Sequence, residues 1–130
     1  MLEFENRAMQ LGIKFAGKSF EGPFELGTWT PAARAGVYCV MVPDSGCVPS
    51  KYRAIYFGET GNFAERAFPS AKNGQAGWLK IADYSQVVHI AAYWMARSTA
   101  DERKAVEREL IQLYGPECNE ILRGHSLLPQ

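Results

Sequence analysis

The amino-acid sequence predicts a small α+β domain: a three-stranded, mostly antiparallel sheet flanked by helices, with an irregular N-terminal extension. Three features predict it, namely two short strand-like runs close together, one longer apolar run, and a strongly marked amphipathic helix near the C-terminus. We expect residues 1–35 to be an extension packed on the domain, residues 36–122 to be the domain, and residues 123–130 to be a tail.

Three segments are predicted strands. The run GVYCVMV, Gly36–Val42, is made of β-branched, aromatic and thiol side chains and ends before a proline. The run YRAIYFG, Tyr52–Gly58, is similar, and the two are expected to pair as a hairpin with a long connection. The third run, Ser85–Ala96, is apolar on both faces, which is typical of a central strand.

Helices are predicted after the second and the third strand. Asn62, with a glutamate three residues on, is the expected cap of the first helix, and a second short helix is expected over residues 74–84. The last helix is the best marked, because Thr99 and Glu102 stand at capping-box spacing and Gly115 follows its apolar periodicity.

One carboxylate of this last helix is expected to face inward. On a helical wheel Glu107 falls between Tyr114 and Ile111, on the apolar face. Burying an unpaired carboxylate is costly, so this side chain requires a partner. Two partners remain open: an ion pair with Arg103, one turn earlier, or a divalent cation held at the edge of a cleft.

One nucleotide-binding pattern is present but is rejected. The segment GIKFAGKS, residues 12–19, matches the phosphate-binding loop G-x-x-x-x-G-K-[ST]. That loop requires a helix immediately after it, whose N-terminus faces the phosphates. Here Gly22-Pro23 follows and would break such a helix, so we treat the match as chance.

Bulk properties exclude several classes of protein. The 14 basic residues balance the 14 acidic ones, which argues against a protein that coats nucleic acid by charge alone. Three cysteines without Cys-x-x-Cys spacing indicate free thiols rather than a disulfide framework or a zinc site. No apolar run could span a bilayer and no signal-peptide pattern is present, so we expect a cytoplasmic location and no membrane partner.

Short motifs recur in a defined order between Gly36 and Asn119. GVY opens the first strand, and YFGETGNFAER, from Tyr56 to Arg66, has the spacing Y-[IV]-G-x-T-x-N-x-x-x-R. ERELIQLYGPECN, which contains Glu107, has the spacing E-x-x-L-I…Y-x-P-x-x-N. This ordered set resembles the GIY-YIG nuclease superfamily, which includes the N-terminal nuclease domain of the repair protein UvrC.

The resemblance implies a metal-dependent endonuclease that hydrolyses DNA phosphodiester bonds. It places Tyr38 near the attacking water, and Tyr56 where it orients water or phosphate. It makes Arg66 a phosphate clamp, because the planar guanidinium matches phosphate oxygens. It makes Glu107 the ligand of one Mg²⁺ or Mn²⁺ and Asn119 a residue that braces the site. DNA is the expected partner, and RNA is a second candidate.

Two positions depart from the family pattern. Many members carry His or Tyr four residues after the arginine, where this chain has Ser70. Some carry Lys directly after the second tripeptide, where this chain has Glu59. Basic residues of the adjoining loops would replace the missing cation, and the complete set of expected substrate contacts is Lys51, Arg53, Thr60, Asn62 and Lys72.

An alternative function remains open on the same residues. The chain would then be a catalytically weak or inactive GIY-YIG domain that acts as a nucleic-acid-binding or interaction module. Ser70, Glu59 and the zero net charge favour this alternative, because they remove a proton carrier and a cation from the implied site.

Overall fold

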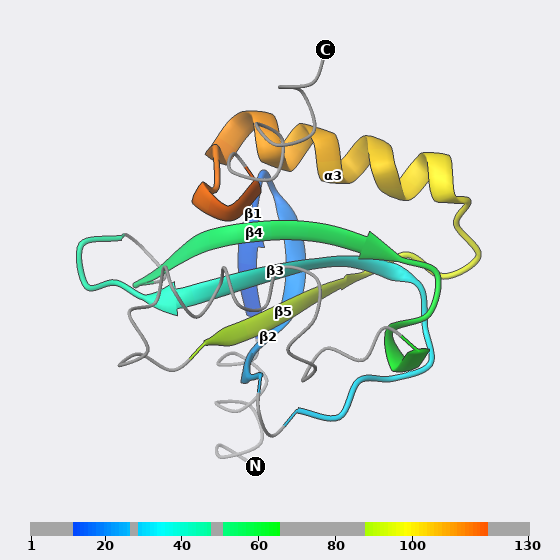
Figure 1. Ribbon diagram of the computed structural model, residues 1–130, viewed down its shortest axis with the longest axis horizontal. Coiled ribbons are helices and arrows are strands. Elements are labelled where there is room, and N and C mark those ends of the chain that lie inside the picture. The colour runs from blue at the N-terminus through cyan, green and yellow to red at the C-terminus, as the bar shows by residue number, and fades with distance from the viewer. Residues whose placement is uncertain (1–11, 27–28, 48–50, 66–87, 120–130) are drawn as a thin grey trace.

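The computed structural model describes residues 12–26, 29–47, 51–65 and 88–119. They form one antiparallel sheet in the order β1-β2-β5-β3-β4, curled into a half-barrel, with helix α3 alongside it (Figure 1). The elements are β1 (Gly12–Phe15), β2 (Lys18–Glu25), β3 (Gly36–Pro43), β4 (Tyr52–Thr60), the 3-10 turn η1 (Phe63–Glu65), β5 (His89–Trp94) and α3 (Ala100–Tyr114). No helix among the described residues is long and apolar enough to cross a membrane.

The predicted fold class is wrong, because the sheet has five strands and the protein is mostly β. Part of the segment predicted to be irregular is regular: β1 and β2, within residues 12–25, form a hairpin that extends the sheet beyond β5. Ile13, Phe15 and Phe20 are buried and alternate with exposed residues, which is the period-two pattern of a half-buried strand. Ala16 and Gly17 adopt φ angles of 53° and 77°, as a tight hairpin turn requires.

The same hairpin confirms that residues 12–19 are not a phosphate-binding loop. Lys18 and Ser19 lie in β2, an extended strand, so no helix N-terminus follows the glycine. The Lys18 ammonium pairs instead with the Glu109 carboxylate of α3, at 3.1 Å.

The three predicted strands are present and lie next to one another. β3 pairs antiparallel with β4 on one side and with β5 on the other. β5 also pairs with β2, which confirms that the third predicted strand is internal. The helix predicted over residues 74–84 lies outside the described residues.

Both ends of α3 are as the sequence predicts. The Thr99 hydroxyl accepts a hydrogen bond from the Glu102 amide at 3.1 Å, and the Glu102 carboxylate accepts one from the Thr99 amide at 2.8 Å. Gly115 ends the helix in the left-handed conformation, with φ 53°, and donates its amide to the Ile111 carbonyl.

Successive strand residues point to opposite faces of the sheet, and each face carries a cluster of buried side chains. One face, here called the tyrosine face, carries Tyr38 and Tyr56, with Phe63 of η1 packed against it. The other, here called the helix face, carries Val37 and Phe57 and is covered by Leu110 of α3 and by the β1-β2 hairpin.

Gly58 is required on the tyrosine face because the Tyr38 ring lies directly over it. The two residues are register partners in the β3-β4 pair. A Cβ atom at Gly58 would overlap the Cζ atom and hydroxyl oxygen of Tyr38 and would lie 2.9 Å from its Cε1 atom. The last residue of the YFG tripeptide therefore has a packing reason that does not depend on catalysis.

Gly58→Ala is expected to destabilise the fold by about 1–3 kcal/mol, the usual range for overpacking a core. Urea unfolding measures the change. The Tyr38→Leu background is the control, because it removes the ring that the new methyl group meets. An equal cost of Gly58→Ala in both backgrounds would show that the Tyr38 ring is not the cause.

Candidate functional site

Helix α3 lies along β4, one of the two edge strands of the sheet (Figure 1). Two of the polar attachments between them lie near the two ends of the helix. Near the start of the helix, the Arg103 Nε atom donates to the Glu59 carboxylate at 2.8 Å. Beyond the end of the helix, the Asn119 side chain accepts from the Phe57 amide at 2.6 Å and donates to the Phe57 carbonyl at 2.9 Å. Asn119 thus occupies both backbone groups of the residue at the centre of YFG.

Glu107 lies between these two attachments and is half-buried, as the helical wheel predicts. Its pKa is raised from 4.5 to about 7, first by burial and then by the negative charge of Glu59. The positive charges of Lys104 and Arg108 oppose this shift without cancelling it. The carboxylate therefore titrates near neutral pH, and a bound cation would offset the negative charge of Glu59 beside it.

The ion pair between Arg103 and Glu107 does not form. Arg103 is directed to Glu59, and its Nη1 atom donates to the carbonyl and hydroxyl oxygens of Ser98. No ion pair found within the described ranges includes Glu107. Of the two partners that the sequence left open for Glu107, Arg103 is therefore excluded, because it bonds Glu59 and Ser98 instead.

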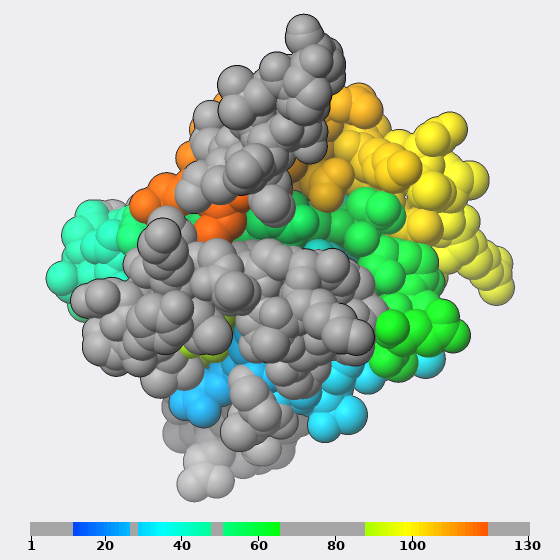
Figure 2. Space-filling view, viewed as in Figure 1, coloured from blue at the N-terminus to red at the C-terminus, as the bar shows by residue number. Residues whose placement is uncertain are grey.

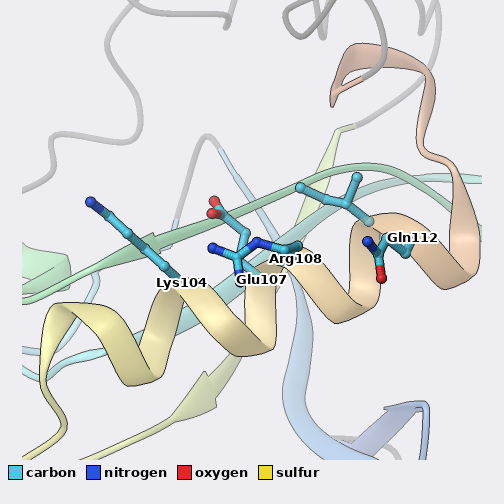
Figure 3. A pocket seen from close by; sticks show the side chains of 5 residues that line it. Lys104, Glu107, Arg108 and Gln112 are labelled. Carbon is cyan, nitrogen blue, oxygen red and sulfur yellow. The ribbon is translucent and has the colours of Figure 1, made fainter.

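A cavity of about 280 Å³ opens beside Glu107. The described residues that line it all belong to one side of α3 and are Lys104, Glu107, Arg108, Ile111 and Gln112. Figure 3 shows Lys104 and Glu107 extending from the helix in the same direction, with Arg108 next to Glu107. In the space-filling view, side chains of α3 reach the surface beside those of β4 (Figure 2).

The chemistry of these donors fits a hard divalent cation. Mg²⁺ is held in proteins by one or two carboxylates, while water and substrate phosphate fill its other positions. Glu107 offers a carboxylate without an ion-pair partner in the described part of the chain, and Glu59 adds negative charge beside it. No group of three or more acidic, His or Cys side chains suited to a metal occurs among the described residues.

The two motif tyrosines lie on the tyrosine face, whereas α3 covers the helix face. Their ring centroids are 6.0 Å apart, and Tyr56 is half-buried. Tyr38 is only 1% exposed, with the Phe63 ring against it at 5.8 Å. The described structure therefore does not bring Tyr38 and Glu107 into one cleft.

The basic residues expected to contact substrate are not near Glu107 where the structure describes them. Arg66 and Lys72, like Ser70, lie outside the described residues. Arg53 forms ion pairs with Asp44 and Glu117. It stands six residues before Glu59 on β4, which is about 20 Å along an extended strand. Lys51 is farther still, in the turn where its carbonyl accepts from the Asp44 amide.

Thr60 and Asn62 have local structural roles. The Thr60 hydroxyl accepts from the Asn62 amide at 3.2 Å. The Asn62 side-chain oxygen accepts from the Ala64 amide at 3.0 Å and so caps η1. Neither side chain is directed by these contacts toward the cavity beside Glu107.

Sequence reasoning missed Lys104 and Arg108. Lys104 stands three residues before Glu107 and four before Arg108, so its side chain neighbours both of them on the helix surface. That spacing was visible in the sequence, but without the cavity it also describes an ordinary solvated helix face. Comparisons with protein-family models, with characterised proteins and with solved structures gave no significant match.

Asn119→Ala is expected to lower the free energy of unfolding by about 2–3 kcal/mol, because two buried backbone groups of Phe57 lose their partner. Chemical denaturation measures the change, and Gln112→Ala on the exposed side of α3 is the control. A loss no greater than that of Gln112→Ala would contradict the bracing role of Asn119.

Glu107→Gln is expected to stabilise the protein at pH 8 and to have less effect at pH 5. The folded protein binds a proton at Glu107 that the unfolded chain releases between pH 4.5 and about 7, so this carboxylate makes stability fall as pH rises through that window. The gain at pH 8 should be on the order of 1 kcal/mol, since partial exposure screens the full shift.

Thermal unfolding of both proteins at pH 5 and pH 8 measures this difference. Glu65→Gln, which removes one exposed carboxylate of η1, is the matched control. If Glu107→Gln stabilises no more than Glu65→Gln at pH 8, the raised pKa of Glu107 is refuted.

Proposed function

We propose that the chain is a metal-dependent endonuclease of the GIY-YIG type, which hydrolyses DNA phosphodiester bonds beside the edge strand β4. One observation carries the proposal. The half-buried carboxylate of Glu107, with its pKa raised to about 7, opens onto a cavity that two cationic side chains, Lys104 and Arg108, also line.

The arrangement of the motifs supports the resemblance on which the proposal rests. The two tripeptides lie on paired strands, with Tyr38 opposite Gly58. Asn119, from the third motif, bonds the central residue of the second tripeptide. Residues far apart in the sequence are thus joined through the positions that the family pattern specifies.

Each named residue then has a chemical task. Glu107 holds the Mg²⁺ or Mn²⁺ ion through its ionised carboxylate, so metal affinity rises as pH increases through about 7. When bound, the cation polarises a phosphoryl oxygen and lowers the pKa of a coordinated water. Arg66 keeps the role of phosphate clamp that the resemblance implies, since a guanidinium matches phosphate geometry.

The geometry separates Tyr38 from Glu107. The phenol is buried on the tyrosine face, under Phe63, while Glu107 belongs to the helix on the other face. Tyr56 is more accessible and is adjacent to Tyr38, so it is the better placed of the two to orient water or phosphate.

The same observations favour one alternative, a GIY-YIG domain that binds nucleic acid or another partner without cutting it. A buried Tyr38 cannot reach a water on a substrate. Glu59, at the position where some family members carry a lysine, pairs with Arg103 and provides no positive charge for a phosphate. Binding alone would need the basic residues but neither tyrosine.

A nicking assay separates the two functions. Supercoiled plasmid and branched DNA are incubated with the protein in Mg²⁺ and in Mn²⁺, beside Glu107→Gln and Tyr38→Phe. Glu107→Gln is expected to slow nicking at least about 100-fold, because it removes the charge that holds the cation. Glu109→Gln, two residues further along α3, is the matched control and should cut normally.

The outcomes decide between the proposals. Nicking that Glu107→Gln leaves intact, or no nicking in either metal, overturns the endonuclease. DNA that still shifts in a gel, equally with wild type and Glu107→Gln, then establishes the binding module. Tyr38→Phe retains the ring over Gly58, so a loss of nicking in that variant would report the hydroxyl rather than the fold.

A further inference from the structure

The cation that the site needs is on α3 itself. A phosphodiester bound to a metal at Glu107 brings negative charge beside Glu107 and Glu59, which are already two carboxylates. The lysine that some GIY-YIG members carry after the second tripeptide is replaced here by Glu59. Some other positive group must therefore compensate for the substrate charge.

The loop residues that sequence reasoning offered for this task are not positioned for it. Arg53 is held by Asp44 and Glu117, about 20 Å along β4 from Glu59. Lys51 precedes β4 at the same end of the strand. Arg53 is thus committed to two carboxylates, and both residues lie at the end of β4 away from Glu59.

Lys104 and Arg108 are positioned for it. Both line the cavity with Glu107 and both lower its pKa by their charge, which shows that they stand within electrostatic range of the carboxylate. Neither takes part in an ion pair of residues 12–26, 29–47, 51–65 and 88–119.

The cavity has room for a phosphate group. Its volume of about 280 Å³ compares with about 30 Å³ for a water molecule in the liquid, and it lies just below the range of sites for larger organic ligands. The remaining described lining, Ile111 and Gln112, adds one apolar side chain and one amide that can donate to a phosphate oxygen.

We propose that Lys104 and Arg108 bind a backbone phosphate of the DNA substrate in the cavity beside Glu107. This inference rests on the proposed function for the identity of the ligand, but it makes a claim about binding that does not require cutting. It assigns the substrate contacts to the helix that carries the metal ligand, rather than to the loops around Lys51 and Arg53.

The test measures binding with cutting switched off. Fluorescence anisotropy of a labelled DNA duplex in EDTA, over a range of NaCl concentrations, gives the slope of log K against log [NaCl]. Lys104→Gln and Arg108→Gln are each expected to reduce the magnitude of that slope by about 1 and the affinity about fivefold at 0.15 M salt. The double variant should lose both contributions.

Lys14→Gln is the matched control. Lys14 is an exposed lysine of β1, outside the cavity, so the variant removes the same charge from another part of the protein. Its slope should equal that of wild type. If the two α3 variants behave like Lys14→Gln, or if wild-type protein does not bind the duplex, the phosphate-binding role of Lys104 and Arg108 is overturned.

The nicking assay keeps this inference distinct from the proposed function. A protein that cuts DNA normally with Lys104→Gln and Arg108→Gln is an endonuclease whose phosphate is held elsewhere. A protein that never cuts, but loses about one unit of salt slope with each α3 variant, has the phosphate site without the hydrolysis. Because both side chains are on the exposed surface of α3, neither substitution is expected to lower the melting temperature.

Discussion

The position of α3 along β4 depends on the ion pair between Arg103 and Glu59. The two side chains are 10% and 17% exposed, so both charges are largely removed from water. Such a pair is stable only when the remaining hydrogen-bonding groups are also satisfied. Arg103 meets this condition through its two bonds to Ser98, just before the helix begins. The first turn of α3 is thereby fixed to the end of the strand that carries YFG.

This ion pair also explains why Glu107 is electrostatically unusual. Glu59 lies beneath the helix, where it bonds Arg103. From the same position its negative charge raises the pKa of Glu107, which is one helical turn after Arg103. Glu59, which departs from the family pattern, is therefore a structural residue whose negative charge acts on both Arg103 and Glu107. It binds an arginine on one side and makes the neighbouring carboxylate a stronger attractor of cations or protons on the other.

Local sequence signals predicted the parts of the fold that depend on local physics. The capping box at Thr99 and the glycine stop at Gly115 determine both ends of α3, and period-two or apolar runs marked β3, β4 and β5. The β1-β2 hairpin was missed because residues 1–35 were taken as an irregular extension, although Ile13, Phe15 and Phe20 alternate with exposed residues.

Contacts between candidate site residues that are far apart in the sequence were harder to predict. A wheel showed that Glu107 faces inward, but it could not show whether Arg103 would bond Glu107 or Glu59, since the strand partner is 44 residues away. Likewise, alternation along β4 puts Tyr56 and Phe57 on opposite faces, but only the structure shows that α3 covers the face of Phe57.

The division between the two faces constrains any hydrolytic mechanism for this protein. A single phosphate beside Glu107 is separated from the Tyr38 hydroxyl by β4, and Tyr38 is sealed by Phe63 on its own side. The proton of the attacking water would then be taken by a group that reaches the helix side of β4, or by solvent if a metal held at Glu107 lowered the pKa of that water. For the second route, α3 would supply an ionised Glu107 to hold the metal and, from adjacent turns, Lys104 and Arg108 to offset the charge of the phosphate.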